Sequence, residues 1–233
     1  MKKLLKRLIL LLLLAIICAG AYFTAAGYVM YKKATQAISV VQKVKEVRTE
    51  DCYTTLDQIP DIYEDAVISV EDHRFYKHHG VDVIALGRAL VKNIQTMEFS
   101  QGGSTITQQL AKNLFFTNEK KIERKAAELF VVYQLEKNYA KDVILELYIN
   151  TVYYGDGYYC VKDAAEGYFN KEPAEMTDYE STMLAGIPNA PSVYAPTKNN
   201  DLAQKRQEHV LNRMVKCGAI TEEQKQKILA EAD

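Results

Sequence analysis

The chain has 233 residues, 48% of them hydrophobic, and a formal net charge of −1. This length allows one compact domain with a real core and a short extra segment, but argues against a two-domain enzyme. Four basic residues lie among the first seven positions, which leaves 25 basic against 30 acidic residues in the remainder. Bulk attraction to nucleic acid needs a basic surface, so we expect no nucleic-acid partner.

Residues 8–31 contain no charged side chain. A helix of this length exceeds the hydrocarbon core of a bilayer, which is about 30 Å thick. The basic tail before it, and Tyr22, Tyr28 and Tyr31 towards its far end, predict a cytoplasmic N-terminus and an outward-facing domain. The alternative is a cleaved signal peptide, because Ala19-Gly20-Ala21 fits a cleavage site.

The remainder is predicted to be mostly helical, with few strand signals. Residues 32–50 have Ile38, Val41 and Val44 at near-helical spacing and are predicted to form a stalk. The predicted organisation is a cytoplasmic tail (1–7), a transmembrane anchor (8–31), a stalk (32–50) and one domain (51–233).

Two stretches show clear helical periodicity, and a third region shows helix-end signals. The periodicity runs from Glu123 to Gln134, and from Lys141 to Ile149, where Ile144, Leu145 and Tyr148 should face a core and Asn150 should cap the end. Near the C-terminus, Gly218 should end one helix, and the capping-box pair Thr221 and Gln224 should open the next.

Three cysteines follow the anchor, namely Cys52, Cys160 and Cys217. An outward-facing domain permits disulfides, but three is an odd number and their spacings match no metal motif. We therefore expect buried or free thiols.

The stretch EDHRFYKHHG, residues 71–80, holds the first candidate site. Glu71 is a candidate general base, since Asp72 beside it and partial burial by Phe75 would both raise its pKa. The alternative is a solvated turn. A metal site is disfavoured, because three histidines at i, i+5 and i+6 do not share one helical face. These histidines are His73, His78 and His79.

The stretch GGSTITQQLAKN, residues 102–113, holds the second. Its glycines free the backbone, and Ser104 or Thr105 should cap a helix that starts near Ile106. An ordinary capped helix would account for Ser104, but not for amide groups and an ammonium on one surface suited to phosphate or sugar oxygens. The candidate binding residues are Ser104, Thr105, Gln108, Gln109, Lys112 and Asn113.

The third candidate is RKAAE, residues 124–128, which puts Arg124 and Glu128 on one helical face beside Lys125. Exposed pairs of this kind are common and contribute only about 0.3–0.5 kcal/mol, so a plain surface ion pair is the alternative. In a functional site the cations would keep Glu128 ionised. It would then orient Arg124 or hold a divalent cation.

Taken in order, these stretches resemble the peptidoglycan glycosyltransferase family, which includes monofunctional enzymes and the transglycosylase domains of bifunctional penicillin-binding proteins. A fifth block, AGIPNAPSVYAP at residues 185–196, resembles the family as well. The family commonly has a glycine where Cys160 stands, and another near Asn170. The residues that carry the resemblance are Glu71, Asp72, Phe75, His78, Gly80, Gly102, Ser104, Thr105, Ile106, Gln108, Gln109, Arg124, Lys125, Glu128, Lys141, Ile144, Leu145, Tyr148 and Asn150.

The resemblance implies a lysozyme-like helical large lobe, a smaller membrane-proximal lobe and a monofunctional transglycosylase. It implies that Glu71 takes a proton from the C4 hydroxyl of lipid II while Lys112, Arg124 and Lys125 stabilise a departing polyprenyl pyrophosphate. Glu128 would organise these cations or bind a divalent ion such as Mg²⁺ or Mn²⁺. The implied partners are lipid II, the lipid-linked glycan chain, the cell membrane, penicillin-binding transpeptidases and other wall-synthesis proteins. The alternatives are a glycan hydrolase and a non-catalytic anchored module that binds lipid II.

Overall fold

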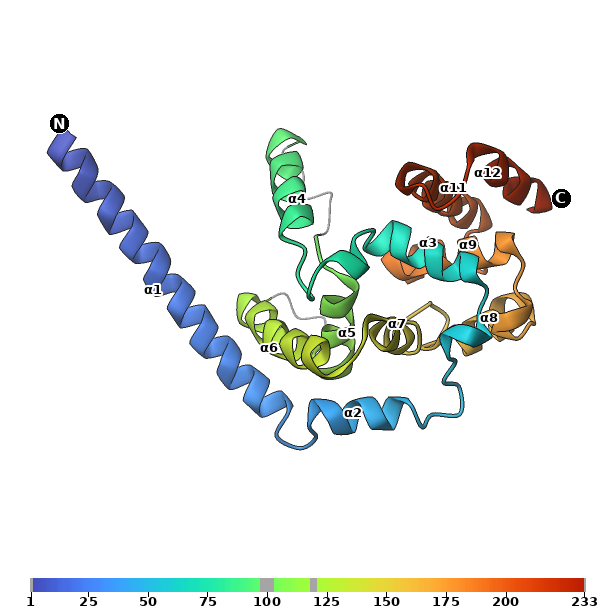
Figure 1. Ribbon diagram of the computed structural model, residues 1–233, viewed down its shortest axis with the longest axis horizontal. Coiled ribbons are helices and arrows are strands. Elements are labelled where there is room, and N and C mark those ends of the chain that lie inside the picture. Colours follow the sequence, from blue (N-terminus) through green and yellow to red (C-terminus); the bar gives the residue numbers. More distant parts are fainter. Residues whose placement is uncertain (1, 97–102, 118–120, 233) are drawn as a thin grey trace.

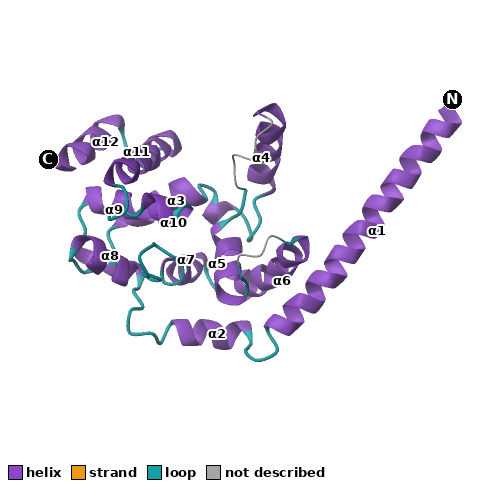
Figure 2. Ribbon diagram, turned by 180° about the vertical axis from the view of Figure 1, so that it is seen from behind, coloured by secondary structure: helices purple, strands orange, loops and turns teal. Residues whose placement is uncertain are grey.

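The computed structural model describes residues 2–96, 103–117 and 121–232 and is built from helices and loops (Figures 1 and 2). Within these ranges, the only β-type pairing is an isolated bridge between Gly155 and Tyr158. The prediction of a mostly α-helical chain is therefore confirmed.

The α-helices follow one another along the whole chain and are joined by short connections. They are α1 (Lys2–Ala34), α2 (Val40–Val47), α3 (Asp61–Glu71), α4 (Val83–Thr96), α5 (Ile106–Phe115), α6 (Ile122–Asn138), α7 (Lys141–Ile149), α8 (Val161–Phe169), α9 (Asp178–Gly186), α10 (Pro191–Tyr194), α11 (Asn200–Cys217) and α12 (Glu222–Leu229). The 3₁₀ turns are η1 (Leu56–Gln58), η2 (Phe75–Lys77), η3 (Pro173–Glu175), η4 (Ile187–Asn189) and η5 (Ala230–Ala232).

Helix α1 is long and apolar enough to cross a membrane, with a mean hydropathy of 2.6 over its most apolar window. Its N-terminal part stands clear of the body, whereas its C-terminal part packs against α6 (Figure 1). Gly27 is buried there, and the helices approach so closely that a Cβ at this position would overlap with Ala126. Tyr28 and Tyr31 place their rings 5.4 and 5.6 Å from that of Phe130. Helix α1 thus continues directly into a tertiary contact.

Helix α2 lies in the segment predicted as a stalk, and it packs on the core. Val40, Val44 and Val47 form its buried face. The spacing of Ile38, Val41 and Val44 did not identify this face, because Val41 is 50% exposed and Ile38 precedes the helix. The i, i+4, i+7 pattern that starts at the first helical residue decides which side faces inward.

The body has two packed groups of helices. Helix α3 lies against α9 and α11, and α5 lies against α6 and α7 (Figure 1). The helices predicted around Glu123 to Gln134 and over Lys141 to Ile149 are confirmed as α6 and α7. On α7 the predicted core residues are almost fully buried, namely Ile144, Leu145 and Tyr148.

The predicted signals at chain turns are also confirmed. Gly218 follows α11 with φ +78°, and Thr221 opens α12 through a capping box with Gln224. Asn170 ends α8 with φ 55°, a left-handed conformation that glycine adopts readily and asparagine tolerates. Cys160 has φ −137° and caps the start of α8, so its backbone does not need glycine.

Helix α4 projects from the body towards the same side as the N-terminal part of α1 (Figures 1 and 2). Asp82 fixes its start, since Oδ1 accepts the N–H groups of Ile84 and Ala85 at 2.9 and 3.0 Å. Its Oδ2 also accepts a hydrogen bond from Arg74 Nε. Among the α4 side chains that the structure describes, large apolar ones are more than half exposed, namely Val83, Ile84, Leu86 and Val91.

Candidate active site

Glu71 is the last residue of α3 and points towards α5. Gln109 Nε2 donates a hydrogen bond of 2.7 Å to Glu71 Oε2. The other end of this amide accepts a longer bond from the buried Tyr148 hydroxyl, at 3.4 Å to Gln109 Oε1. Residues from three helices therefore determine where the Glu71 carboxylate lies.

Burial raises the pKa of the Glu71 carboxyl group, and the neighbouring charge of Asp72 raises it further. The hydrogen bond from Gln109 and the positive charges of Arg206 and Lys112 act in the opposite direction. The net shift is upward, as predicted for a group that must accept a proton near neutral pH.

Asp72 is buried and holds the loop after α3 in place. Its carboxylate lies 2.9 and 3.0 Å from His78 Nε2, and Oδ2 accepts the backbone N–H of Ile106 at 3.2 Å. His78 in turn lies edge-on to the buried ring of Phe75. These contacts tie the end of α3 to the start of α5, so the first candidate stretch is a packed structure and not a solvated turn.

The start of α5 is capped by Thr105 and not by Ser104. Gln108 N donates to Thr105 Oγ1 at 3.1 Å, and Thr105 N donates to Gln108 Oε1 at 3.0 Å. The Thr105 hydroxyl also donates a bond of 2.6 Å to the carbonyl of Gly80, where φ is +84°. Thr105 and Gln108, predicted as binding residues, thus use polar atoms to shape the helix start. Gly102 lies outside the described residues.

The carboxylate of Glu128 faces two cations on the same helix. Glu128 is 1% exposed and pairs with Arg124, while Lys125 Nζ lies 2.8 Å from its Oε2. Lys125 also donates a hydrogen bond of 3.2 Å to Ser104 Oγ. Burial of Glu128 distinguishes this cluster from an exposed surface pair. It joins the third candidate stretch to the second.

Lys112 is a half-buried cation on α5 that interacts with both acidic groups. Burial lowers the pKa of its ammonium group, as do the positive charges of Arg124 and Lys125, whereas Glu128 and Glu71 raise it. A cation thus interacts electrostatically with both carboxylates. The three candidate stretches, far apart in the sequence, form one polar site.

One site residue was missed by the sequence reasoning. Arg206, on α11, is half-buried, and its positive charge lowers the pKa of Glu71. Its Nε donates to the Gly186 carbonyl at 3.2 Å, and its guanidinium lies 5.6 Å from the ring centre of Tyr194. Arg206 sits in a helix rich in charged residues, so no local pattern distinguishes it.

Asn113, which was also predicted as a binding residue, lies outside this polar site. It lines a cavity of about 270 Å³ together with Cys52 and Cys160. Among the described residues, the metal-ligating group found is Cys52, Cys160 and Asp163, and it includes no histidine.

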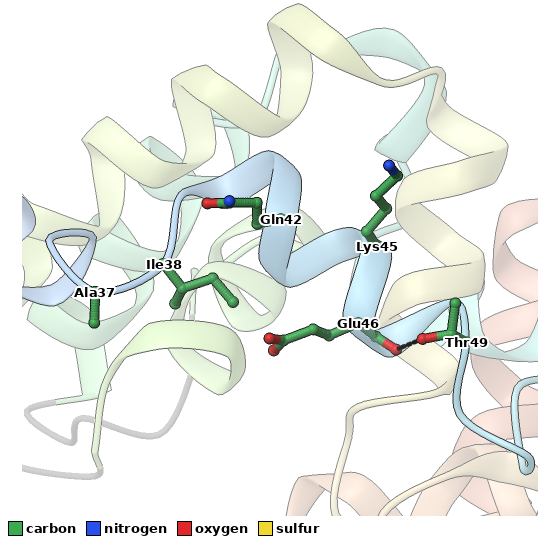
Figure 3. Close-up of a pocket in the computed structure, with 6 residues that line it drawn as sticks. All are labelled: Ala37, Ile38, Gln42, Lys45, Glu46 and Thr49. Carbon is green, nitrogen blue, oxygen red and sulfur yellow. Dashed lines mark hydrogen bonds between the residues drawn. The ribbon is translucent and has the colours of Figure 1, made fainter.

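A hollow of about 620 Å³ lies beside α2 (Figure 3). It is lined by Lys45 and Glu46 among mostly neutral side chains, and the Thr49 hydroxyl donates to the carbonyl of Glu46. It contains no residue of the Glu71 and Glu128 site. We therefore place the candidate chemistry at the latter.

Comparison with known proteins identifies the family. The transglycosylase family model matches residues 36–215. Penicillin-binding protein 1A of Neisseria flavescens is 44% identical over 179 residues, which is 77% of this chain and 22% of that protein. Penicillin-binding protein 1A/1B of Bacillus subtilis is 42% identical over 185 residues, with coverage of 78% and 20%.

The chain spans about a fifth of the length of these curated relatives. Among solved structures, the crystal structure of penicillin-binding protein 1A from Haemophilus influenzae is similar, with a TM-score of 0.44 and 22% identity over 76% of this chain and 17% of that chain. The family model includes all three groups of site residues and starts ahead of α2. The chain therefore belongs to the transglycosylase family.

Proposed function

We propose that this protein polymerises the glycan strands of peptidoglycan. It transfers the growing lipid-pyrophosphate-linked chain to the C4 hydroxyl of lipid II N-acetylglucosamine, with inversion, and forms β-1,4 bonds. Undecaprenyl pyrophosphate leaves. The observation that carries this proposal is the electrostatic link from Glu71 through Lys112 to the Arg124 and Glu128 cluster.

Glu71 is the general base of the proposed reaction. A sugar hydroxyl is a weak nucleophile at neutral pH, so a base must take its proton as the new bond forms. The raised pKa of Glu71 makes it a better proton acceptor than an ordinary carboxylate. Gln109 keeps the carboxylate oriented through its hydrogen bond to Oε2.

The cations stabilise the leaving group. Charge accumulates on the pyrophosphate as the glycosidic bond to it breaks, and fixed cations in a partly buried site stabilise that charge. Lys112 and Arg124 are half-buried, and Lys125 is more exposed at the edge. Their number matches the charge of a diphosphate better than that of a neutral glycan, which argues against a hydrolase.

Glu128 organises these cations in the proposed mechanism. Arg124 pairs with one of its oxygens, and Lys125 lies 2.8 Å from the other. A divalent ion such as Mg²⁺ or Mn²⁺ would have to displace a cation from this single carboxylate. The donor set therefore does not fit a metal, and no step is assigned to one.

The proposed location is the outer face of the cell membrane, with the N-terminus in the cytoplasm and α1 as a single-pass anchor. The end of α1 that carries Gly27, Tyr28 and Tyr31 packs on the body, so the domain would lie close to the membrane surface. Helix α4 projects to the side where α1 extends (Figure 1), and it carries exposed apolar side chains, so it is suited to contact the bilayer surface. Both lipid-linked substrates and wall-synthesis partners, including penicillin-binding transpeptidases, would be met there.

The test is incubation of the purified full chain with labelled lipid II, with and without moenomycin, the substrate-mimicking inhibitor of the family. We expect polymer that disappears with moenomycin and is absent in Glu71→Gln. The matched control is Glu64→Gln on the same helix, whose carboxylate accepts a bond from Tyr76 and also has a raised pKa. Degradation of finished peptidoglycan without polymerisation would support a hydrolase, and binding without turnover a silent module.

A further inference from the structure

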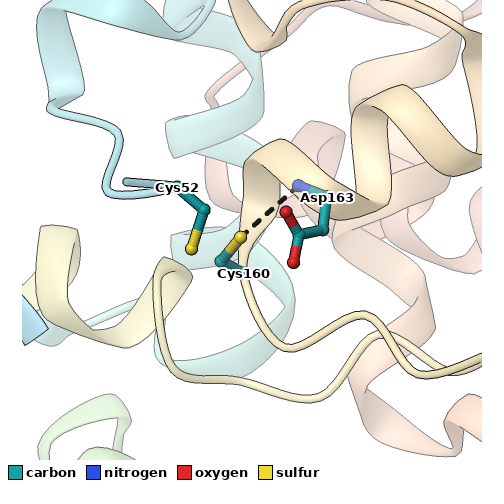
Figure 4. A group of neighbouring side chains, drawn as sticks. All are labelled: Cys52, Cys160 and Asp163. Carbon is teal, nitrogen blue, oxygen red and sulfur yellow. Dashed lines mark hydrogen bonds between the residues drawn. The ribbon is translucent and has the colours of Figure 1, made fainter. Parts of the chain in front are cut away.

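Cys52 and Cys160 lie together although 107 residues separate them in the sequence. Cys52 is in the turn region between α2 and η1, and Cys160 caps the start of α8. Their sulfur atoms and a carboxylate oxygen of Asp163 lie within 4.8 Å of one another. In Figure 4 the side chains of Cys52 and Cys160 approach each other from separate segments.

We propose that Cys52 and Cys160 form an intramolecular disulfide bond. The bond would join the segment that leaves the membrane-proximal helix α2 to the N-terminus of α8. Neither the family assignment nor the proposed activity requires it. It rests only on the proposed orientation, which exposes the domain to an oxidising environment.

The backbone on both sides of the pair is held in place. Asn150 Oδ1 accepts the N–H of Thr54 and its Nδ2 donates to the Thr54 carbonyl, each at 2.8 Å. Cys52 is therefore two residues from a fixed point. On the other side, Asp163 N donates to Cys160 Sγ at 3.4 Å within the first turn of α8. A disulfide needs sulfur atoms about 2.05 Å apart, so the two sulfur atoms, now within 4.8 Å of each other, must still come closer.

The surroundings favour a disulfide over a metal site. A metal would need both thiols in the ionised form for as long as it is bound, and burial raises the pKa of the Cys160 thiol, which disfavours its charged form. A disulfide carries no charge and suits this partly dry position. The cavity of about 270 Å³ that both cysteines line gives an oxidant access.

The chemistry is thiol–disulfide exchange with a small or protein disulfide as the oxidant. The half-buried Cys52 is reached first; as a thiolate it attacks one sulfur of the oxidant and releases one thiolate. The resulting mixed disulfide is then attacked by the minor thiolate form of Cys160, whose proton goes to solvent. This step forms the Cys52–Cys160 bond and releases the second thiolate. The protein thiols are oxidised and the oxidant disulfide is reduced to two thiols.

The test treats the purified full chain in detergent with oxidised glutathione, alkylates the remaining thiols and maps peptides without reduction. We expect a cross-linked peptide pair containing Cys52 and Cys160, and loss of alkylation at both, while Cys217 remains alkylated or carries glutathione. Reduction should restore both thiols. Cys217→Ser, which changes an exposed thiol, should leave the cross-link unchanged.

A single variant provides a second, independent measurement. In Cys160→Ser, Cys52 should accumulate as a mixed disulfide with glutathione, because its resolving thiol is missing. Alkylation of both thiols after oxidation, or a glutathione adduct on Cys52 with Cys160 intact, would overturn the proposal. So would protection of both thiols by Zn²⁺ alone with no cross-link under oxidant. Lipid II polymerisation is measured separately, so loss of the proposed activity and absence of the bond are distinguishable.

Discussion

Gln109 donates a hydrogen bond of 2.7 Å to Glu71 and accepts one from Tyr148, so one amide joins the carboxylate to the buried side of α7. The amide has a fixed orientation, because its Nε2 is the donor and its Oε1 the acceptor. The hydrogen bond from Gln109 stabilises the ionised form of Glu71 and so lowers its pKa. The bond therefore affects both the position of the carboxylate and the pH at which it titrates.

Gln109→Ala should move the acidic limb of the kcat/KM–pH profile to higher pH. The hydrogen bond from Gln109 lowers the pKa of Glu71, so its loss raises that pKa. A general base acts only when it is deprotonated, and activity is therefore lost earlier as the pH falls. Polymerisation rates across a pH series measure the shift. Gln134→Ala on α6 is the control, and an unchanged limb in Gln109→Ala would contradict the assignment.

Lys112→Ala and Arg124→Ala should each lower turnover by about 100-fold or more, since each removes a donor for charge that develops on the leaving group.

Burial lowers the pKa of Lys112, so its charge is lost at lower pH than for an ordinary lysine. Lys112→Arg should therefore move the alkaline limb to higher pH, because arginine stays charged. Single-turnover rates test both points, with the exposed Lys45→Ala as the control. Effects below threefold for both alanine variants would exclude the proposed roles.

Asp72→Ala should destabilise the fold by about 3 kcal/mol, because it leaves the buried Ile106 N–H and the His78 ring without their acceptor. The loss is measured by chemical denaturation. Asp57→Ala, at an exposed position, should change stability little. An Asp72→Ala protein as stable as the parent would show that this carboxylate does not hold the two segments together.

Gly27→Leu should weaken the packing of α1 on α6, since a Cβ at this position would meet Ala126. Overpacking of this kind costs about 1–3 kcal/mol. Thermal unfolding and limited proteolysis in detergent should show an earlier loss of α1 protection. Gly20→Leu is a matched control on the same helix, because no atom lies within 4 Å of a Cβ built there. Equal behaviour of the two variants would exclude a specific contact at Gly27.

Local features of the fold followed from the sequence. Helix α7 and the ends of α11 and α12 depend on apolar periodicity and capping residues close to one another in the chain. The sequence left open whether Ser104 or Thr105 caps α5, because both hydroxyls can do so. In the structure Thr105 is the cap, and its hydroxyl also donates a hydrogen bond to the Gly80 carbonyl. This bond joins two segments whose proximity cannot be predicted from helical periodicity.

The site was predicted in part for the same reason. Helical spacing put Arg124 and Glu128 on one face, but only packing of α6 against α5 shows that Glu128 is buried. Arg206 comes from α11, and its effect on Glu71 depends on how α11 packs against α3. A residue whose role depends on long-range packing has no local signal of its own.

The docking of α1 on α6 has a consequence for the proposed anchoring of the domain at a membrane. A flexible tether would let the site sample many heights above the lipid headgroups, whereas a rigid helix determines one. Helix α6 carries both the contact with Tyr28 and Tyr31, through Phe130, and the cations Arg124 and Lys125. The depth at which α1 is inserted would therefore set the height at which a diphosphate is bound. Each residue added to α1 would change this height by about 1.5 Å.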